Sequence, residues 1–159
     1  MKSAPIIARL WDYGWLCHDI VSLPASVSDS TLIEHYISSP AFHNSFLPSD
    51  KDESGVHGPF VAARIHADDF IPLEQAGVEE YLKSVEVSYT PGEDFAAHGQ
   101  ILPHLRSAFE RNLKCYVLRR DERDKDFFHD WGFVLCVFRE FLFAGQSRNS
   151  LERFIIGYD

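Results

Sequence analysis

The run from Trp131 to Asp159 constrains the fold more than any other part of the chain. It is dense in aromatic and β-branched residues, the types that pack well on a pleated surface. Within residues 131–138 both alternating sets of side chains are apolar, as in a strand that is covered on both faces. We therefore predict that residues 131–138 form the central strand of a sheet. The predicted scaffold side chains are Phe133, Leu135, Val137, Phe141, Phe143, Phe154 and Ile156.

Shorter patterns upstream predict the other elements. Alternating apolar residues indicate strands, and apolar residues three and four apart indicate amphipathic helices. Residues 41–58 are loop-like, and Pro103 lies inside the last helical pattern, which therefore begins near it or is kinked there. Asp68 and Asp69 before Pro72 suit a first helical turn. The expected strands are 5–11, 15–21, 59–66, 85–89 and 114–119, and the expected helices are 32–37, 72–85 and 101–113.

This order of elements favours the α+β class. Strands lie at both ends of the chain with helices between them, and the regular alternation of a doubly wound fold is missing. We expect an antiparallel or mixed sheet of about five to seven strands with two to three helices packed on one face. Because no repeat, low-complexity tract or linker interrupts the chain, residues 1–159 are predicted to form a single domain.

Charge argues against several classes of partner. The formal net charge is −9, whereas nucleic-acid binders usually carry a basic patch, and anionic membranes repel an acidic surface. Residues 1–113 hold seven Lys and Arg against sixteen Asp and Glu, while residues 114–159 hold eight of each. The acidic field therefore belongs to the first two thirds of the chain, where it favours a cationic partner.

Cysteine usage and hydropathy predict a cytoplasmic protein. Cys17, Cys115 and Cys136 are odd in number, widely spaced and set in apolar segments, so neither a disulfide framework nor a zinc knuckle is expected. The N-terminal residues show no apolar core of a signal peptide, and no apolar run reaches membrane-spanning length.

The sequence lacks the common cofactor and metal motifs. No two of the eight histidines have the spacing of a metallohydrolase motif, and His98 and His104 fall on different faces of a helix. The acidic stretch 121–130 lacks the glycine and the closing glutamate of a calcium loop. Glycine-rich phosphate loops and the nucleophile-elbow motif are also missing. We therefore expect no cofactor and no metal.

One alternative is a small thiol or carboxylate hydrolase. Cys17 and His18 point to opposite faces of a strand, so Cys17 would need His66 with Asp68 or Asp69 to form a catalytic triad. In that case His18, His66, Asp68 and Asp69 would gather in a groove with strongly shifted pKa values. A second alternative is an aromatic-lined domain that binds a small ligand in a cavity beneath the sheet.

The leading hypothesis is a small acidic interaction protein that is not an enzyme. A stiff aromatic core, an acidic surface and the lack of a catalytic motif suit a bacterial immunity protein that binds and neutralises a basic toxin or effector, such as a cationic nuclease. Secretion chaperones and adaptors share these traits, and the chain would be a monomer or a homodimer. The predicted partner-binding residues are Asp50, Asp52, Glu53, Asp68, Asp69, Glu79, Glu80, Glu93 and Asp94.

Overall fold

The architecture is that of a computed structural model. No helix in the part of the chain that it describes is long and apolar enough to cross a membrane. The described residues are 6–9, 14–24, 27–46, 55–86, 94–112, 114–121, 123–130, 132, 135, 137–145 and 148–158.

An antiparallel sheet organises the molecule. Its described strands number six, in the order β1-β2-β8-β7-β6-β5, so β8 and β7 occupy the centre while β1 and β5 form the edges. A second pairing joins the two short strands β3 and β4. The strands are β1 (Ile6–Arg9), β2 (Gly14–Ser22), β3 (Val56–His57), β4 (Phe60–Val61), β5 (Phe70–Leu73), β6 (Lys114–Leu118), β7 (Val137–Ala144) and β8 (Ser150–Tyr158).

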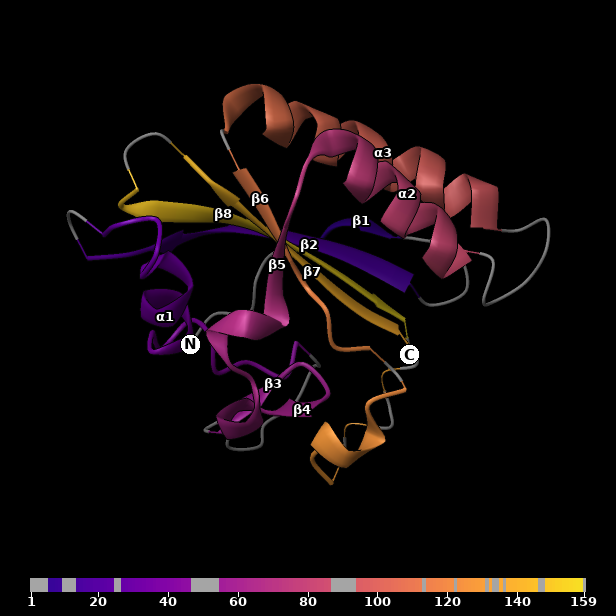
Figure 1. Cartoon of the computed structure of the whole chain (residues 1–159). Helices are drawn as coiled ribbons and strands as arrows, with labels where there is room; N and C mark the ends of the chain where they lie inside the picture. Colours follow the sequence, from indigo (N-terminus) through magenta and orange to yellow (C-terminus); the bar gives the residue numbers. More distant parts are fainter. Residues whose placement is uncertain are drawn as a thin grey trace.

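The fold is of the predicted α+β class, with two long helices packed on one face of the sheet as expected and a short helix on the opposite face. The long helices α2 (Gln75–Glu86) and α3 (Asp94–Arg111) lie side by side on one face (Figure 1). The short helix α1 (Leu32–Ile37) lies on the opposite face, together with β3 and β4. Three 3-10 turns complete the described structure, namely η1 (Ala62–Arg64), η2 (Ala67–Asp69) and η3 (Lys125–Phe127).

The core forms two layers separated by the sheet. All eight residues of β7 are buried, and alternation sends Phe141 and Phe143 towards α2 and α3. Phe138 and Leu142 point to the other face, where they join Tyr36 of α1. Every described member of the predicted scaffold set is buried, while Phe133 lies outside the described residues.

The predicted position of the central strand is wrong by several residues. β7 begins at Val137, and neither Gly132 nor Leu135 belongs to a strand. The N–H of Gly132 donates to the carbonyl of His129 in a turn, and a Cβ on Gly132 would lie 2.1 Å from the carbonyl oxygen of Pro59. Because this turn packs directly on the backbone at Pro59, the chain cannot already be extended there.

The segment between β4 and α2 also differs from the prediction. Only Phe60 and Val61 of the predicted strand 59–66 pair with another strand, after which the chain turns through η1 and η2. Pro72 lies in the edge strand β5 rather than in a first helical turn, and α2 begins at Gln75. An edge strand tolerates proline because the missing N–H can face away from the sheet.

Of the remaining predicted elements, some are confirmed and others differ in position or type. β1 and β2 form an antiparallel pair, and α1 occupies the predicted residues 32–37. α3 continues through Pro103 and starts well before it, at Asp94. The predicted strand 85–89 is wrong at its first two residues, which end α2, and its other residues lie outside the described part of the chain.

Candidate functional site: an acidic ridge and a buried polar network

Two exposed carboxylates lie just beyond the two ends of the edge strand β5, and a third lies on the helix that follows it. Asp68 precedes the strand, Glu74 follows it, and Glu80 lies on the outer side of the next helix, α2. None of the three forms an ion pair with another residue that the structure describes. We call this set the β5 ridge. It contains Asp68 and Glu80 from the predicted partner-binding set and adds Glu74, which was not among the predicted residues.

Asp69 has a structural role instead. Its side chain is buried, its Oδ2 accepts a hydrogen bond from the His66 N–H at 2.9 Å, and its Oδ1 lies 2.7 Å from Nη2 of Arg120. These contacts close the η2 turn and tie it to the segment after β6. Asp69 is therefore not available to a partner.

Glu79 is also engaged within the fold. Its carboxylate accepts hydrogen bonds from Arg106 Nε of α3 at 3.0 Å and from Gln75 at 3.1 Å. These two hydrogen bonds lower the pKa of Glu79 to about 2. The residue remains ionised at neutral pH, but its charge is matched by Arg106 across the α2–α3 contact.

The side chains of five predicted partner-binding residues lie outside the part of the chain that the structure describes. Asp94 is the first residue of α3, but its side chain is outside the described part. The other four are Asp50, Asp52, Glu53 and Glu93, which lie outside the described residues. Their role stays a prediction from the sequence.

The residues of the hydrolase hypothesis are not brought together. Cys17 packs in the layer with α1, whereas His18 stacks on Phe154 in the layer with α2 and α3, at 4.4 Å between ring centroids. β2 and β5 are four strand spacings apart, which is roughly 19 Å. His66 and Asp68 lie beside β5, so a triad with Cys17 does not form.

His18 instead belongs to a half-exposed cluster around Glu152. His18 Nε2 lies 3.0 Å from Glu152 Oε1, Asn112 donates to Oε2 at 2.7 Å, and Arg111 also binds Oε1. Burial by itself raises the pKa of Glu152, but the hydrogen bonds from Arg111 and Asn112 outweigh it, so that the pKa is lowered. This cluster ties the end of α3 to β8 and β2.

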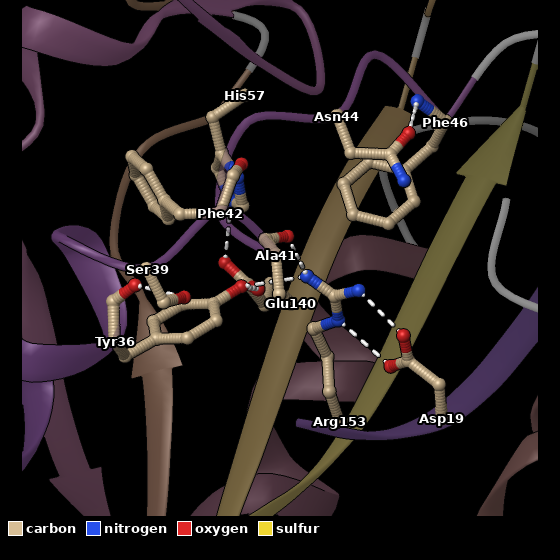
Figure 2. A network of polar contacts seen from close by, with 10 residues as sticks. All are labelled: Asp19, Tyr36, Ser39, Ala41, Phe42, Asn44, Phe46, His57, Glu140 and Arg153. Carbon is tan, nitrogen blue, oxygen red and sulfur yellow. Dashed lines mark hydrogen bonds and ion pairs between the residues drawn. The ribbon is translucent and has the colours of Figure 1, made fainter. Parts of the chain in front are cut away.

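A second set of charged side chains is buried between the sheet and α1 (Figure 2). Arg153 of β8 donates from Nε and Nη2 to the two carboxylate oxygens of Asp19 on β2, at 2.8 and 2.6 Å. Its Nη1 donates to the Tyr36 hydroxyl at 3.0 Å and to the Ala41 carbonyl at 2.7 Å. A buried guanidinium requires such partners, because an unpaired buried charge is strongly unfavourable.

Tyr36 links this arginine to Glu140 of β7. Its hydroxyl accepts from Arg153 and donates to Glu140 Oε1. Burial first, and then the negative charge of Glu140, raise the pKa of Tyr36 well above 10. The phenol therefore stays protonated and links the guanidinium of Arg153 to the carboxyl group of Glu140 through two hydrogen bonds.

His57 of β3 completes the buried polar network, which consists of Asp19, Tyr36, His57, Glu140 and Arg153. The imidazole of His57 is fully buried, with Nε2 2.7 Å from Glu140 Oε2 and Nδ1 2.6 Å from the Phe42 carbonyl oxygen. Its ring stacks on Phe42 at 3.9 Å between centroids. Both ring nitrogens thus face an acceptor.

The network binds two segments of the chain to the sheet. Residues 38–46 and 55–61, here called the arm, contact each other through a bridge between Asn44 and His57. The N–H of Gly58 donates to the Asn44 carbonyl at 2.8 Å. From the sheet, Glu140 meets His57 and Arg153 meets Ala41, so polar bonds as well as aromatic packing hold the arm in place.

The sequence contains a signal from which this network could have been predicted. Arg139, Glu140, Glu152 and Arg153 interrupt apolar runs with strong strand propensity. Charged residues inside a strand that is apolar on both faces must be paired within the core. Burial keeps the network from meeting a substrate, and no group of three or more metal-ligating side chains was found among the described residues.

Comparisons with known proteins identify no relative. No protein-family model, no curated protein and no solved structure matches the chain. Its function is therefore inferred from the charge pattern and from the geometry of the described residues.

Proposed function

We propose that this chain is a small acidic protein-interaction module, a bacterial immunity protein that binds and neutralises a cationic toxin of the nuclease type. The observation that carries the proposal is the β5 ridge, where Asp68, Glu74 and Glu80 are exposed and form no ion pair with a described residue. A nuclease needs a cationic surface for its substrate, so an acidic surface is attracted to the site that it must block.

The backbone beside the ridge favours recognition through side chains. β5 is an edge strand, yet the N–H of Phe70 donates to the Ala67 carbonyl and Pro72 has no N–H. A partner strand would find few free donors along this edge. The carboxylates are therefore the groups through which a partner would bind.

A rigid support suits such a binder. The ridge borders a core in which β7 is wholly buried and Glu79 is already neutralised by Arg106. A rigid backbone beneath the carboxylates limits the loss of backbone conformational entropy when a partner binds. The same rigidity would serve a chaperone or an adaptor, so neutralisation of toxicity has to be tested as well as binding.

The experiment has two stages. The immobilised chain is first used to capture basic proteins from a lysate of its native host at low salt, and the captured protein is co-expressed with and without the chain in a test bacterium. We expect a basic protein that is toxic alone and harmless together with the chain. Capture of proteins that are not toxic, or failure to protect, would contradict the immunity proposal.

Charge reversal then locates the surface. D68K/E74K/E80K is compared with E34K/E110K/D130K, which reverses three other exposed carboxylates and changes the net charge equally. We expect the first variant to slow association with the toxin at least about tenfold at low salt, and the control to slow it much less. Equal slowing by the two variants would show that net charge acts without the ridge.

A further inference from the structure

The hydrogen bonds of His57 determine how many protons the buried pair holds. Nδ1 faces the Phe42 carbonyl, which can only accept, so Nδ1 carries a hydrogen. Nε2 faces Glu140 Oε2 at 2.7 Å in a place that water does not reach. Two lone pairs at this distance would repel each other, so a second hydrogen lies between Nε2 and Oε2.

Neighbouring groups confirm the direction of these bonds. Arg153 donates to the Tyr36 hydroxyl, so Tyr36 must direct its own hydrogen at Glu140 Oε1. The shared proton on the other oxygen leaves His57 and Glu140 together neutral, whether it sits on Nε2 or on Oε2. Arg153 and Asp19 balance each other in the same network.

No other described ion pair touches the His57–Glu140 contact. The charged or titratable groups that face it are Tyr36 from α1, Arg153 from β8 and, behind Arg153, Asp19 from β2. The rings of Phe42, Phe46 and Phe138 surround the rest of the imidazole. The ring of His43 forms a T-shaped contact with Phe42, at 5.8 Å between centroids, and Cys17 lies on the same sheet face two strands from Glu140.

We propose that the His57–Glu140 pair is a one-proton latch, which holds the arm on the sheet and releases it as the pH rises through the neutral range. In the closed state the shared proton is required. In an opened state both groups meet water, where at neutral pH and above an imidazole ring carries one hydrogen and a carboxylate carries none. Opening then releases one proton, so its equilibrium constant rises about tenfold per pH unit above neutrality.

Opening of the latch does not require the central ladder to separate, because β7 and β8 pair over Val137–Ala144 without the arm. His57 lies between the two residues that bond to Asn44, since the Val56 carbonyl accepts from the Asn44 N–H and the Gly58 N–H donates to the Asn44 carbonyl. Withdrawal of the imidazole from Glu140 therefore disturbs both of these bonds. The latch does not depend on the proposed toxin partner.

Amide hydrogen exchange of the wild-type chain tests the latch. We expect the protection factors of the Asn44 and Gly58 amides, which bond to Val56 and Asn44, to fall about tenfold per unit between pH 7 and pH 9. Those of the Phe141 and Phe154 amides in the central ladder should be larger at every pH, because these amides exchange only in a larger unfolding, which also releases the latch proton. Constant protection at Asn44 and Gly58 over this range would overturn the proposal.

E140Q is the decisive variant. A glutamine can accept from Tyr36 and donate to Nε2 of a neutral His57, so it imitates the closed pair without a titratable proton. We expect the pH dependence at Asn44 and Gly58 to vanish in E140Q. It should persist in E152Q, which alters the half-exposed pair of His18 and Glu152. Protection factors at Asn44 and Gly58 that fall with pH as steeply in E140Q as in the wild type would refute the latch.

A direct observation covers the case in which E140Q does not fold. NMR of the wild-type chain with 15N-labelled histidine at pH 7.5 should show two slowly exchanging protons at the His57 imidazole, one on Nδ1 and one shared with Glu140. The absence of a slowly exchanging proton between Nε2 and Glu140 at this pH would overturn the proposal.

Discussion

Arg153 of β8 and Asp19 of β2 are direct cross-strand neighbours joined by a two-point ion pair. Their Nε–Oδ1 and Nη2–Oδ2 distances are 2.8 and 2.6 Å. Asp19 reaches the edge of the core, with 24% of its side chain exposed, while only 2% of the Arg153 side chain is exposed. The aspartate thus balances a guanidinium whose remaining donor binds Tyr36 and Ala41 deep inside.

Replacing this guanidinium is expected to destabilise the fold severely. R153L leaves the Asp19 carboxylate and the Tyr36 hydroxyl without their donor, and removing one partner of a buried pair costs about 3–5 kcal/mol. Urea denaturation at pH 7 measures the loss. R106L, which breaks the surface pair with Glu79, is the matched control and should change the unfolding free energy little. Similar losses in both variants would contradict the assigned role of Arg153.

Tyr36 is expected to make the fold sensitive to strong alkali. Burial, followed by the charge of Glu140, raises the pKa of Tyr36 above its value of about 10 in the unfolded chain. Its contribution is therefore complete below pH 10 and decreases as the pH rises further, by about 1.4 kcal/mol per unit. Y36F should remove this part of the pH dependence of the unfolding free energy, which urea titrations between pH 10 and pH 11.5 measure. An unchanged slope in Y36F would mean that the phenol ionises normally.

Glu152 is expected to make the stability of the fold depend on pH under acidic conditions. Burial opposes its charge, but hydrogen bonds from Arg111 and Asn112 lower its pKa in the folded state. A lowered pKa gives stability above about pH 4.3, where the unfolded carboxyl is ionised, and that stability is lost as the pH falls. E152Q should cost about 1–2 kcal/mol at pH 7 and progressively less as the pH falls below about 4. Thermal unfolding of the wild type and E152Q between pH 2 and pH 7 measures this cost. A cost that does not change with pH would contradict the prediction.

Two glycines at the base of the arm provide a matched pair of substitutions. Gly58 and Gly55 both have positive φ, of 51° and 83°, so alanine strains the backbone at either position. A Cβ at Gly58 would also lie 2.5 Å from the Phe138 ring, while nothing lies within 4 Å at Gly55. We expect G55A to cost about 1 kcal/mol and G58A about 1–3 kcal/mol more. Equal unfolding free energies would show that the Phe138 ring moves aside freely.

Periodicity predicted much of the local structure. Alternation placed Trp15, Cys17, Asp19 and Val21 on one face of a strand, and β2 has this arrangement, with the three apolar ones in the layer beside α1. The apolar stripe of α2 was also found from its spacing. These features depend on residues a few positions apart, so the local sequence contains the information that determines them.

Positions that depend on a distant backbone were predicted less well. Residues 131–136 look like a strand, but the turn at Gly132 is set by its contact with Pro59, more than seventy positions away. Asp68 and Asp69 are adjacent, yet one is exposed and the other is bound by Arg120. Neither outcome can be read from the neighbouring residues, because each is decided by what the folded chain brings alongside.

By itself, the sequence determined an α+β fold around an aromatic C-terminal sheet, and an acidic surface contributed by the first two thirds of the chain. Only the tertiary structure decided that Asp19, Tyr36, His57, Glu140 and Arg153 share one buried network. Strand periodicity assigns a side chain to a face, but its partners across that face depend on the strand order β2-β8-β7 and on how the arm packs over it. Charges inside an apolar strand show that partners must exist, and long-range packing selects them.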